Sequence, residues 1–290
     1  MTTEALAELL AVHLWAALVV ATFVMLLGAW LLWSGLQRYG TRITALSHEW
    51  LIRMGPHVQR LPFPGAVQDL WQMVRRLGVQ VLLSMAVAVT ACVGFVEIAD
   101  EMGMDEDLGQ FDFALSAAMS RHAGEDQLRF FAAITDFGDK GFLIPLAIFI
   151  ALFLVFRRQR FLAAAWVVAT ASGALLNAAL KAFFERSRPP HLHSFASADG
   201  WSFPSGHSSG AVIVYGLLGY LVVVHLPKRF HLPVAVIAMM LIVFVGFSRV
   251  ILQVHYFSDV LGGYAFGAAW VAAWIAGLEA FRRRQLLSPN

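Results

Sequence analysis

Three short polar clusters interrupt an otherwise apolar sequence, and their residue types suit chemistry on an anion. They read KAFFERSRPP at Lys181–Pro190, PSGH at Pro204–His207 and SRVILQVHYFSD at Ser248–Asp259. Each cluster lies where an apolar run begins or ends, which is where ionisable groups of a membrane protein mark functional sites. The clusters are therefore the first candidates for a common site.

The first cluster offers two cations. Lys181 and Arg188 are seven residues apart, close to two helical turns, so a continuous helix would point both from one face. Pro189 and Pro190 are expected to end that helix, and cations near a helix C-terminus are favoured by its dipole. An alternative is that Lys181 is an interface residue whose charge reaches toward the headgroups.

The second cluster is typical of a helix N-terminus that binds an anion. Pro204 suits the first turn of a helix, and Ser205 and Gly206 would then expose backbone N–H groups without helical partners. Glycine also lets a ligand approach the backbone closely. His207 follows, within reach of a group held there. An ordinary helix start capped by Ser205 explains the same residues.

The third cluster contains Arg249, His255 and Asp259, the only charged residues or histidines between Leu232 and Glu279. His255 and Asp259 are four apart, so they are neighbours if this stretch is helical. A carboxylate on one imidazole nitrogen fixes the tautomer and leaves the other nitrogen free to attack. The alternative is a salt bridge that joins two helices.

Together the clusters predict a phosphate site. Three cations suit the equatorial oxygens of a phosphoryl group in transfer, and two histidines with different partners can act as nucleophile and general acid. Two histidines and an aspartate can also bind iron or zinc, but the surrounding cations (Lys181, Arg188 and Arg249) favour an anion. We therefore expect no metal and no cofactor.

The elements that must position these groups are membrane-spanning helices. The chain is 59% hydrophobic and 14% charged, where soluble domains have about 25% charged residues. Seven apolar runs are evident: 9–36, 77–98, 141–156, 161–180, 208–226, 232–247 and 260–281. The third and sixth are shorter than the roughly 20 residues that a spanning helix needs and must recruit their flanks. The one cysteine, Cys92, excludes an internal disulfide and is expected to be a small buried side chain.

The basic residues predict the orientation. With alternating sides, one face collects fourteen of the 21 lysines and arginines, including the groups at 157–160 and 282–284. Such a face is normally cytoplasmic, which places the N-terminus and all three clusters outside, on the periplasmic side of a bacterial inner membrane, and the C-terminus inside. The acidic 100–140 loop is then external and includes a possible surface helix, FDFALSAAMSRH. The basic 37–76 loop is internal, with interfacial helices or a plain connector as alternatives.

The order and spacing of the clusters resemble the three motifs of the type 2 phosphatidic acid phosphatase superfamily. The pattern Lys-x6-Arg-Pro, Pro-Ser-Gly-His and Ser-Arg-x5-His-x3-Asp is matched at every position between 181 and 259. The flanking runs from about 77 to 281 resemble the six-helix core of membrane members. The expected fold is all-α, a polytopic membrane bundle in which residues 77–290 form this core. Residues 1–76 add one N-terminal transmembrane helix and the basic loop.

The resemblance implies a role for each site residue. His255 is the nucleophile that forms a phosphohistidine, Asp259 orients it, and His207 protonates the leaving oxygen and later activates water. The phosphoryl oxygens are held by Lys181, Arg188, Arg249, Ser205 and Gly206. Four nearby residues outside the motifs are interpreted as loop residues with a possible headgroup contact: Glu185, Arg186, His191 and His193.

The predicted function is hydrolysis of a phosphate monoester or pyrophosphate on a membrane lipid, without a nucleic acid partner. The resemblance suggests undecaprenyl pyrophosphate, phosphatidylglycerol phosphate, phosphatidate or lipid A phosphates. Two alternatives remain open, a lipid-to-lipid phosphotransferase with the same site and a non-catalytic lipid-binding or transport protein. Vanadium haloperoxidases share the motifs, but they are soluble, which the seven apolar runs disfavour.

Overall fold

The computed structural model describes residues 2–16, 18–20, 22–23, 27, 53, 66–190 and 195–287. Within these ranges, six helical segments are long and apolar enough to cross a membrane: Gln80–Glu101, Glu125–Phe156, Arg160–Phe184, Gly206–His225, Lys228–Ile251 and Phe257–Gln285. The predicted all-α membrane bundle and its six-helix core are thereby confirmed.

The two short apolar runs reach spanning length by recruiting their flanks, as expected. Helix α5 (Glu125–Thr135) continues through the 3-10 turn η1 (Asp136–Gly138) into α6 (Lys140–Phe156), which makes one 32-residue segment. In the same way η2 (Lys228–Phe230) leads directly into α9 (His231–Ile251). Part of the acidic 100–140 loop thus belongs to a span.

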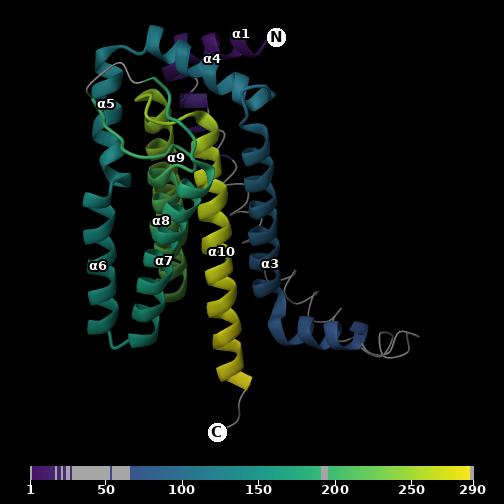
Figure 1. Cartoon of the computed structure of the whole chain (residues 1–290). Coiled ribbons are helices and arrows are strands. Elements are labelled where there is room, and N and C mark those ends of the chain that lie inside the picture. The colour runs from purple at the N-terminus through teal and green to yellow at the C-terminus, as the bar shows by residue number, and fades with distance from the viewer. Residues whose placement is uncertain are drawn as a thin grey trace.

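Helix α10 (Phe257–Leu287) packs against both α3 (Ala66–Glu101) and α8 (Gly206–His225) (Figure 1). Glycines on α10 allow α8 to approach closely. A Cβ built on Gly263 would lie 2.8 Å from the carbonyl oxygen of Ser205, and one on Gly267 would lie 2.7 Å from Cβ of Val212. Small residues at such crossings let membrane helices pack backbone to backbone. This packing fixes the start of α8 against the start of α10.

Different elements lie at the two ends of the bundle (Figure 1). At one end, called the upper end here, α4 (Asp107–His122) and α1 (Thr3–Val12) lie across the spans. The C-terminal end of α10 and the turn between α6 and α7 (Arg160–Phe184) lie at the opposite end. That end carries the basic residues at 157–160 and 282–284. The predicted surface helix corresponds to α4.

Helix α1 is fastened to α4 through Glu8, whose carboxylate accepts from Arg121 Nη2 at 2.8 Å and lies 2.5 Å from His122 Nε2. A bend of 89° separates α1 from the helical piece Leu14–Val20. If this bent pair is one span, the number of candidate spans rises to seven. The rest of the first apolar run, and most of the 37–76 loop, lie outside the described residues.

Candidate active site

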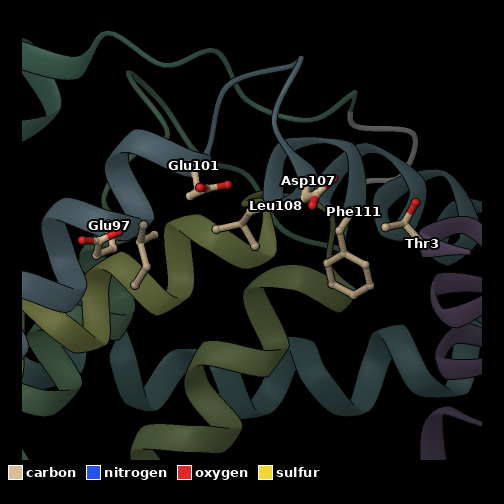
Figure 2. Close-up of a pocket in the computed structure, with 7 residues that line it drawn as sticks. Thr3, Glu97, Glu101, Asp107, Leu108 and Phe111 are labelled. Atoms are coloured by element: carbon tan, nitrogen blue, oxygen red, sulfur yellow. The ribbon is translucent and has the colours of Figure 1, made fainter.

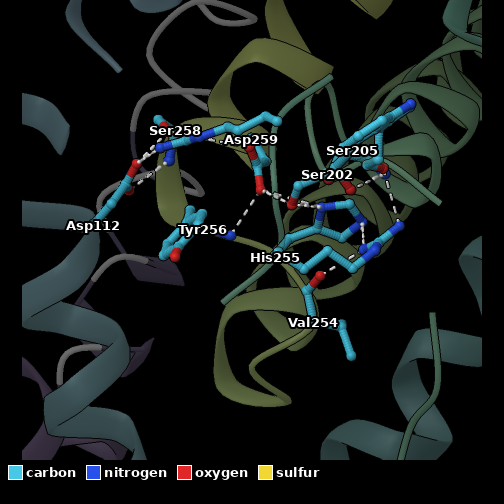
Figure 3. A network of polar contacts seen from close by, with 12 residues as sticks. Asp112, Ser202, Ser205, Val254, His255, Tyr256, Ser258 and Asp259 are labelled. Carbon is cyan, nitrogen blue, oxygen red and sulfur yellow. Dashed lines mark hydrogen bonds and ion pairs between the residues drawn. The ribbon is translucent and has the colours of Figure 1, made fainter. Parts of the chain in front are cut away.

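The site residues predicted from the three clusters converge at the upper end of the bundle. They come from the end of α7, the start of α8, the end of α9 and the start of α10. The N–H of Ser205 donates to the carbonyl oxygen of Asp259 at 2.9 Å, which joins the second and third clusters directly. Figure 3 shows Ser202, His255 and Asp259 in contact in this region.

His255 and Asp259 form a buried pair. His255 Nδ1 lies 3.3 Å from Asp259 Oδ2, and the two residues are 3% and 0% exposed. The segment from His255 to Asp259 is not one helix. His255 lies in the turn before α10, and Asp259 lies in the first turn of that helix. The carboxylate also accepts the Tyr256 N–H at 2.8 Å, in the manner of a capping box. The predicted contact therefore forms across a helix N-terminus.

An ionised carboxylate only accepts hydrogen bonds, so Nδ1 of His255 carries the ring proton and Nε2 keeps its lone pair. Arg188 Nη1 lies 3.2 Å from Nε2. Burial lowers the pKa of His255 to about 3, although Asp259 opposes the shift. The neutral imidazole thus presents an unprotonated nitrogen beside a cation, which suits attack on an anionic phosphorus.

Arg188 reaches the site differently from the prediction. Helix α7 ends at Phe184, and Glu185 takes a left-handed conformation with φ 45°, so Lys181 and Arg188 do not share one helical face. The residue before a proline is driven away from the helical region, which agrees with the absence of helix at Arg188. Its guanidinium is held by the carbonyls of Asp199, Gly200, Trp201 and Val254.

Lys181 lies in the last turn of α7 and faces the start of α8. Its Nζ donates to the carbonyl oxygens of Trp201 at 2.6 Å and Ser202 at 3.0 Å. A Cβ built on Gly206 would meet Cε of Lys181 at 3.9 Å, so the cation and the N-terminus of α8 are adjacent. Both favour a bound anion.

Helix α8 begins at Gly206, so the expected place of Pro204 in its first turn is wrong. Pro204 precedes the N-cap instead of occupying the first turn. Ser205 is the N-cap, and its hydroxyl accepts the Ser208 N–H at 3.5 Å. The capping role that was one interpretation of Ser205 is therefore present.

Arg249 is a buried cation with an open donor. It is 2% exposed, and its Nη1 donates to Thr135 Oγ1 at 2.8 Å. Its Nε has no hydrogen-bond partner among the described residues. Buried polar groups are normally paired, so this donor fits an anion that completes the site. Arg249 lies in the last turn of α9, beside the segment that carries His255.

His207, in the first turn of α8, faces a carboxylate that the motifs do not include. Asp139 Oδ2 lies 3.5 Å from His207 Nε2, while Asp139 Oδ1 accepts the Gly141 N–H at 2.7 Å as the N-cap of α6. Asp139 belongs to a stretch with many acidic residues, so its type alone gave no signal for this contact.

Contacts of Ser202, Arg186 and Asp112 extend the site beyond the three motifs. Ser202 donates to Asp259 Oδ2 at 2.5 Å and lies 3.2 Å from His255 Nδ1. Arg186, interpreted above as a loop residue, binds Asp259 Oδ1 at 2.7 Å and Asp112 Oδ2 at 2.8 Å. The only signal for Arg186 was a further cation inside the first cluster. Glu185 makes no side-chain contact with these groups, and His191 and His193 lie outside the described residues.

A separate cavity of about 410 Å³ lies between α1, α3 and α4 (Figure 2). Its lining includes Glu97, Glu101 and Asp107 together with Leu108 and Phe111, and none of the residues of the three clusters. Its carboxylates would repel a phosphate, so it is distinct from the candidate active site.

Comparison with known proteins identifies the family. The model of the PAP2 superfamily matches residues 162–283. The crystal structure of a transmembrane PAP2 type phosphatidylglycerolphosphate phosphatase from Bacillus subtilis superposes with a TM-score of 0.61 and 30% identity, over 70% of this chain and 98% of that one. The chain belongs to the PAP2 superfamily. It is a multi-pass membrane member, because its apolar spans accompany that structural match.

Two curated relatives within the PAP2 superfamily are also similar to it. Phosphatidylglycerophosphatase B of Bacillus subtilis (strain 168) is 39% identical over 139 residues, which are 46% of this chain and 66% of the relative. A lipid A 1-phosphatase of Rhizobium johnstonii is 36% identical over 106 residues, 33% of this chain and 39% of the relative. In each case the match spans less than two thirds of the relative.

Proposed function

We propose that this protein is a lipid phosphatase that hydrolyses a phosphate monoester or pyrophosphate through a phosphohistidine on His255. The observation that carries the proposal is that the two ring nitrogens of His255 have different partners: Nδ1 faces Asp259 and Nε2 faces Arg188. A nitrogen with a lone pair beside a cation fits the attack on a phosphoryl group, because Arg188 can hold the phosphoryl oxygens next to that nitrogen.

In the first step, His255 Nε2 attacks phosphorus, the P–N bond forms and the bond to the lipid oxygen breaks. His207, in its protonated form, gives its proton to that oxygen. A monoester thus releases a neutral lipid alcohol, and a pyrophosphate releases a lipid phosphate protonated at the former bridging oxygen. The charge on the phosphoryl oxygens is balanced by Lys181, Arg188 and Arg249. The N–H of Gly206, the first residue of α8, can donate to the same oxygens, whereas the N–H of Ser205 is already bound to the carbonyl oxygen of Asp259.

In the second step, water attacks the phosphorus and His207 takes its proton. The P–N bond breaks, phosphate leaves and His255 returns to the neutral form. Fixed cations stabilise the transition state in both steps, so the proposed mechanism uses no metal ion.

Phosphatidylglycerol phosphate is the substrate we propose first, because the solved relative and the first curated relative are both described as acting on it. Phosphatidate, undecaprenyl pyrophosphate and lipid A phosphates are the further candidates. The site would face the periplasm, since the basic residues gather at the opposite end of the bundle.

The test is phosphate release by the full-length protein in detergent micelles that contain each of these four lipids. We expect release from at least one lipid, undiminished by EDTA. The variants His255→Gln and His207→Gln should lose activity on the order of 1,000-fold or more. His225→Gln, at an exposed histidine of α8 remote from the three clusters, is the matched control. Absence of release from all four lipids, or its loss on chelation, would overturn the proposal.

A further inference from the structure

We propose that Arg186 and Asp112 are positioning residues that hold the Asp259 carboxylate in the orientation His255 needs. The inference rests on the proposed function of His255 as nucleophile. Neither residue belongs to the three motifs, and Asp112 lies on α4, 74 positions before Arg186.

Arg186 is bound on several sides. Its Nη1 donates to Asp259 Oδ1 at 2.7 Å and to Ser258 Oγ at 2.6 Å. Its Nη2 donates to Asp112 Oδ2 at 2.8 Å and to the Met102 carbonyl at 3.2 Å. The Tyr256 ring lies against the guanidinium, 4.6 Å from its centre. Because the guanidinium is a rigid planar fork, these contacts leave it a single orientation.

Asp112 fixes the other side of this cluster. It is 1% exposed, and its Oδ1 accepts the N–H of Ser258 at 2.9 Å, while its Oδ2 accepts the Ser258 hydroxyl. Ser258 lies in the first turn of α10, so the carboxylate satisfies a helix N–H that has no partner within the helix. Figure 3 shows Asp112 and Ser258 on one side of Asp259, and His255 on the other. Helix α4 is thereby linked to the start of α10.

The two oxygens of Asp259 have separate tasks. Oδ2 faces His255 Nδ1 and accepts from Ser202 and Tyr256, whereas Oδ1 is bound by Arg186. Arg186 therefore fixes the plane of the carboxylate from the side opposite to the histidine. Without it, Asp259 could rotate, and the Nδ1–H tautomer that leaves Nε2 free would no longer be enforced.

Arg186 also offsets part of the negative charge of this cluster. One guanidinium lies between two buried carboxylates, Asp112 and Asp259. Burial alone would lower the pKa of Arg186, but the two carboxylates outweigh it and the pKa is raised. The guanidinium thus stays charged and permits both carboxylates to stay buried.

The first experiment measures kcat and KM for phosphate release from the best lipid of the panel. Arg186→Gln should lower kcat about 10- to 100-fold while KM changes little, because a small misplacement of a reacting group costs rate rather than binding. Arg186→Lys should fall between wild type and Arg186→Gln, since a single ammonium cannot bind both carboxylates in the same fork. The control is Arg121→Gln, an exposed arginine of α4 that pairs with Glu8 and should keep wild-type kcat.

A second variant separates positioning from folding. Arg186→Gln leaves Asp112 buried without its cation, so we pair it with Asp112→Asn, which removes the unbalanced charge. If the double variant has a wild-type melting temperature and still a low kcat, the proposal is supported. A double variant that regains wild-type kcat would overturn it. Failure of all the Arg186 variants to fold would overturn it also, because the cluster would then hold the fold rather than the catalytic pair.

Nuclear magnetic resonance of ring-labelled histidine keeps this test separate from that of the proposed function. The His255 signals are assigned as those missing in His255→Gln. We expect one tautomer, protonated at Nδ1, in the wild type and in Arg121→Gln, and a mixture of tautomers in Arg186→Gln. An unchanged tautomer in Arg186→Gln contradicts positioning, whereas a wild type that releases no phosphate contradicts only the proposed function.

Discussion

At the residue scale, the surroundings of His255 keep its imidazole neutral. Its ring contacts Asp259 and Arg188, and the positive charges of Arg249 and Lys181 help to lower its pKa. Burial dominates and lowers its pKa from the ordinary 6.5 to about 3. A neutral ring has a lone pair on Nε2 throughout the physiological range, so no other base is needed to activate it.

The lowered pKa of His255 predicts how stability depends on pH. The folded protein binds fewer protons than the unfolded chain between pH 6.5 and 3, so this contribution is complete above pH 6.5 and is lost as the pH falls. Between pH 7 and pH 5 the loss should be about 2 kcal/mol. Melting temperatures in detergent should therefore drop over this interval, and less so in His255→Gln.

The exposed His225 provides the comparison for this prediction. His225→Gln should reproduce the wild-type drop in melting temperature. If His255→Gln follows the wild-type curve as well, the ring of His255 is not held neutral by burial.

The order and spacing of the motifs identify eight candidate site residues in the sequence, but they do not identify the residues that contact them. Lys181, His207 and His255 have unusual types for their apolar surroundings, which made them visible. Asp112 and Asp139 lie among ten acidic residues between 100 and 140, where a carboxylate is ordinary. Their contacts with Arg186 and His207 come from tertiary packing, which one sequence does not specify.

At the scale of elements, the site depends on how closely the first turns of α8 and α10 approach. Gly263 of α10 faces the carbonyl of Ser205, the N-cap of α8. Since that neighbour is backbone, it cannot yield as a side chain would. The position of the PSGH turn is thus set by a glycine outside the motifs.

Gly263→Ala should displace the start of α8. The added Cβ would lie 2.8 Å from the Ser205 carbonyl oxygen and 2.9 Å from Ser208 Cβ. Overpacking of this kind costs about 1–3 kcal/mol, and the shift of the turn should lower kcat at least about 10-fold. Thermal unfolding and phosphate release measure the two effects.

Gly219→Ala is the matched control on α8, because a Cβ there meets nothing within 4 Å. It should leave both stability and turnover near the wild type. Equal behaviour of the two alanine variants would contradict the account of the crossing.

The apolar runs predict which segments are helices. They do not predict where each helix ends or which of its side chains face the lipid. The spacing of Lys181 and Arg188 predicts a helix that continues from the 161–180 run to Pro189, but α7 ends at Phe184. Cys92 was expected to be buried, and it is exposed on α3. In a membrane protein the lipid takes the place of the protein core, so an apolar surrounding in the sequence does not imply burial within the chain.

At the scale of the whole molecule, the unequal distribution of basic residues between the two ends of the bundle predicts which side of the membrane the site faces. The candidate site lies at the upper end with α1 and α4, and the clusters of arginines lie at the other end. From the positive-inside rule we predict that the site faces the periplasm. This orientation rests on charge alone and follows directly from the sequence.

Labelling of single cysteines tests the orientation. In a Cys92→Ala background, Asp126→Cys at the start of α5 should react with a membrane-impermeant maleimide on intact cells. Arg157→Cys, in the turn after α6, should react only after lysis. The opposite pattern would place the site in the cytoplasm.

The six-helix core and its match to a transmembrane PAP2 structure confirm the fold expected from the motifs. The substrate does not follow in the same way, because headgroup contacts depend on side chains outside the shared motifs.

The most direct test of the central claim is to trap the covalent intermediate. Substrate with radiolabelled phosphate is mixed with excess protein, quenched in alkali, where phosphohistidine survives, and the labelled peptide is identified by mass spectrometry. We predict phosphate on His255 in the wild type and none in His255→Gln. Label on another residue, or full turnover of lipid phosphate by His255→Gln, would contradict the claim that this histidine is the nucleophile.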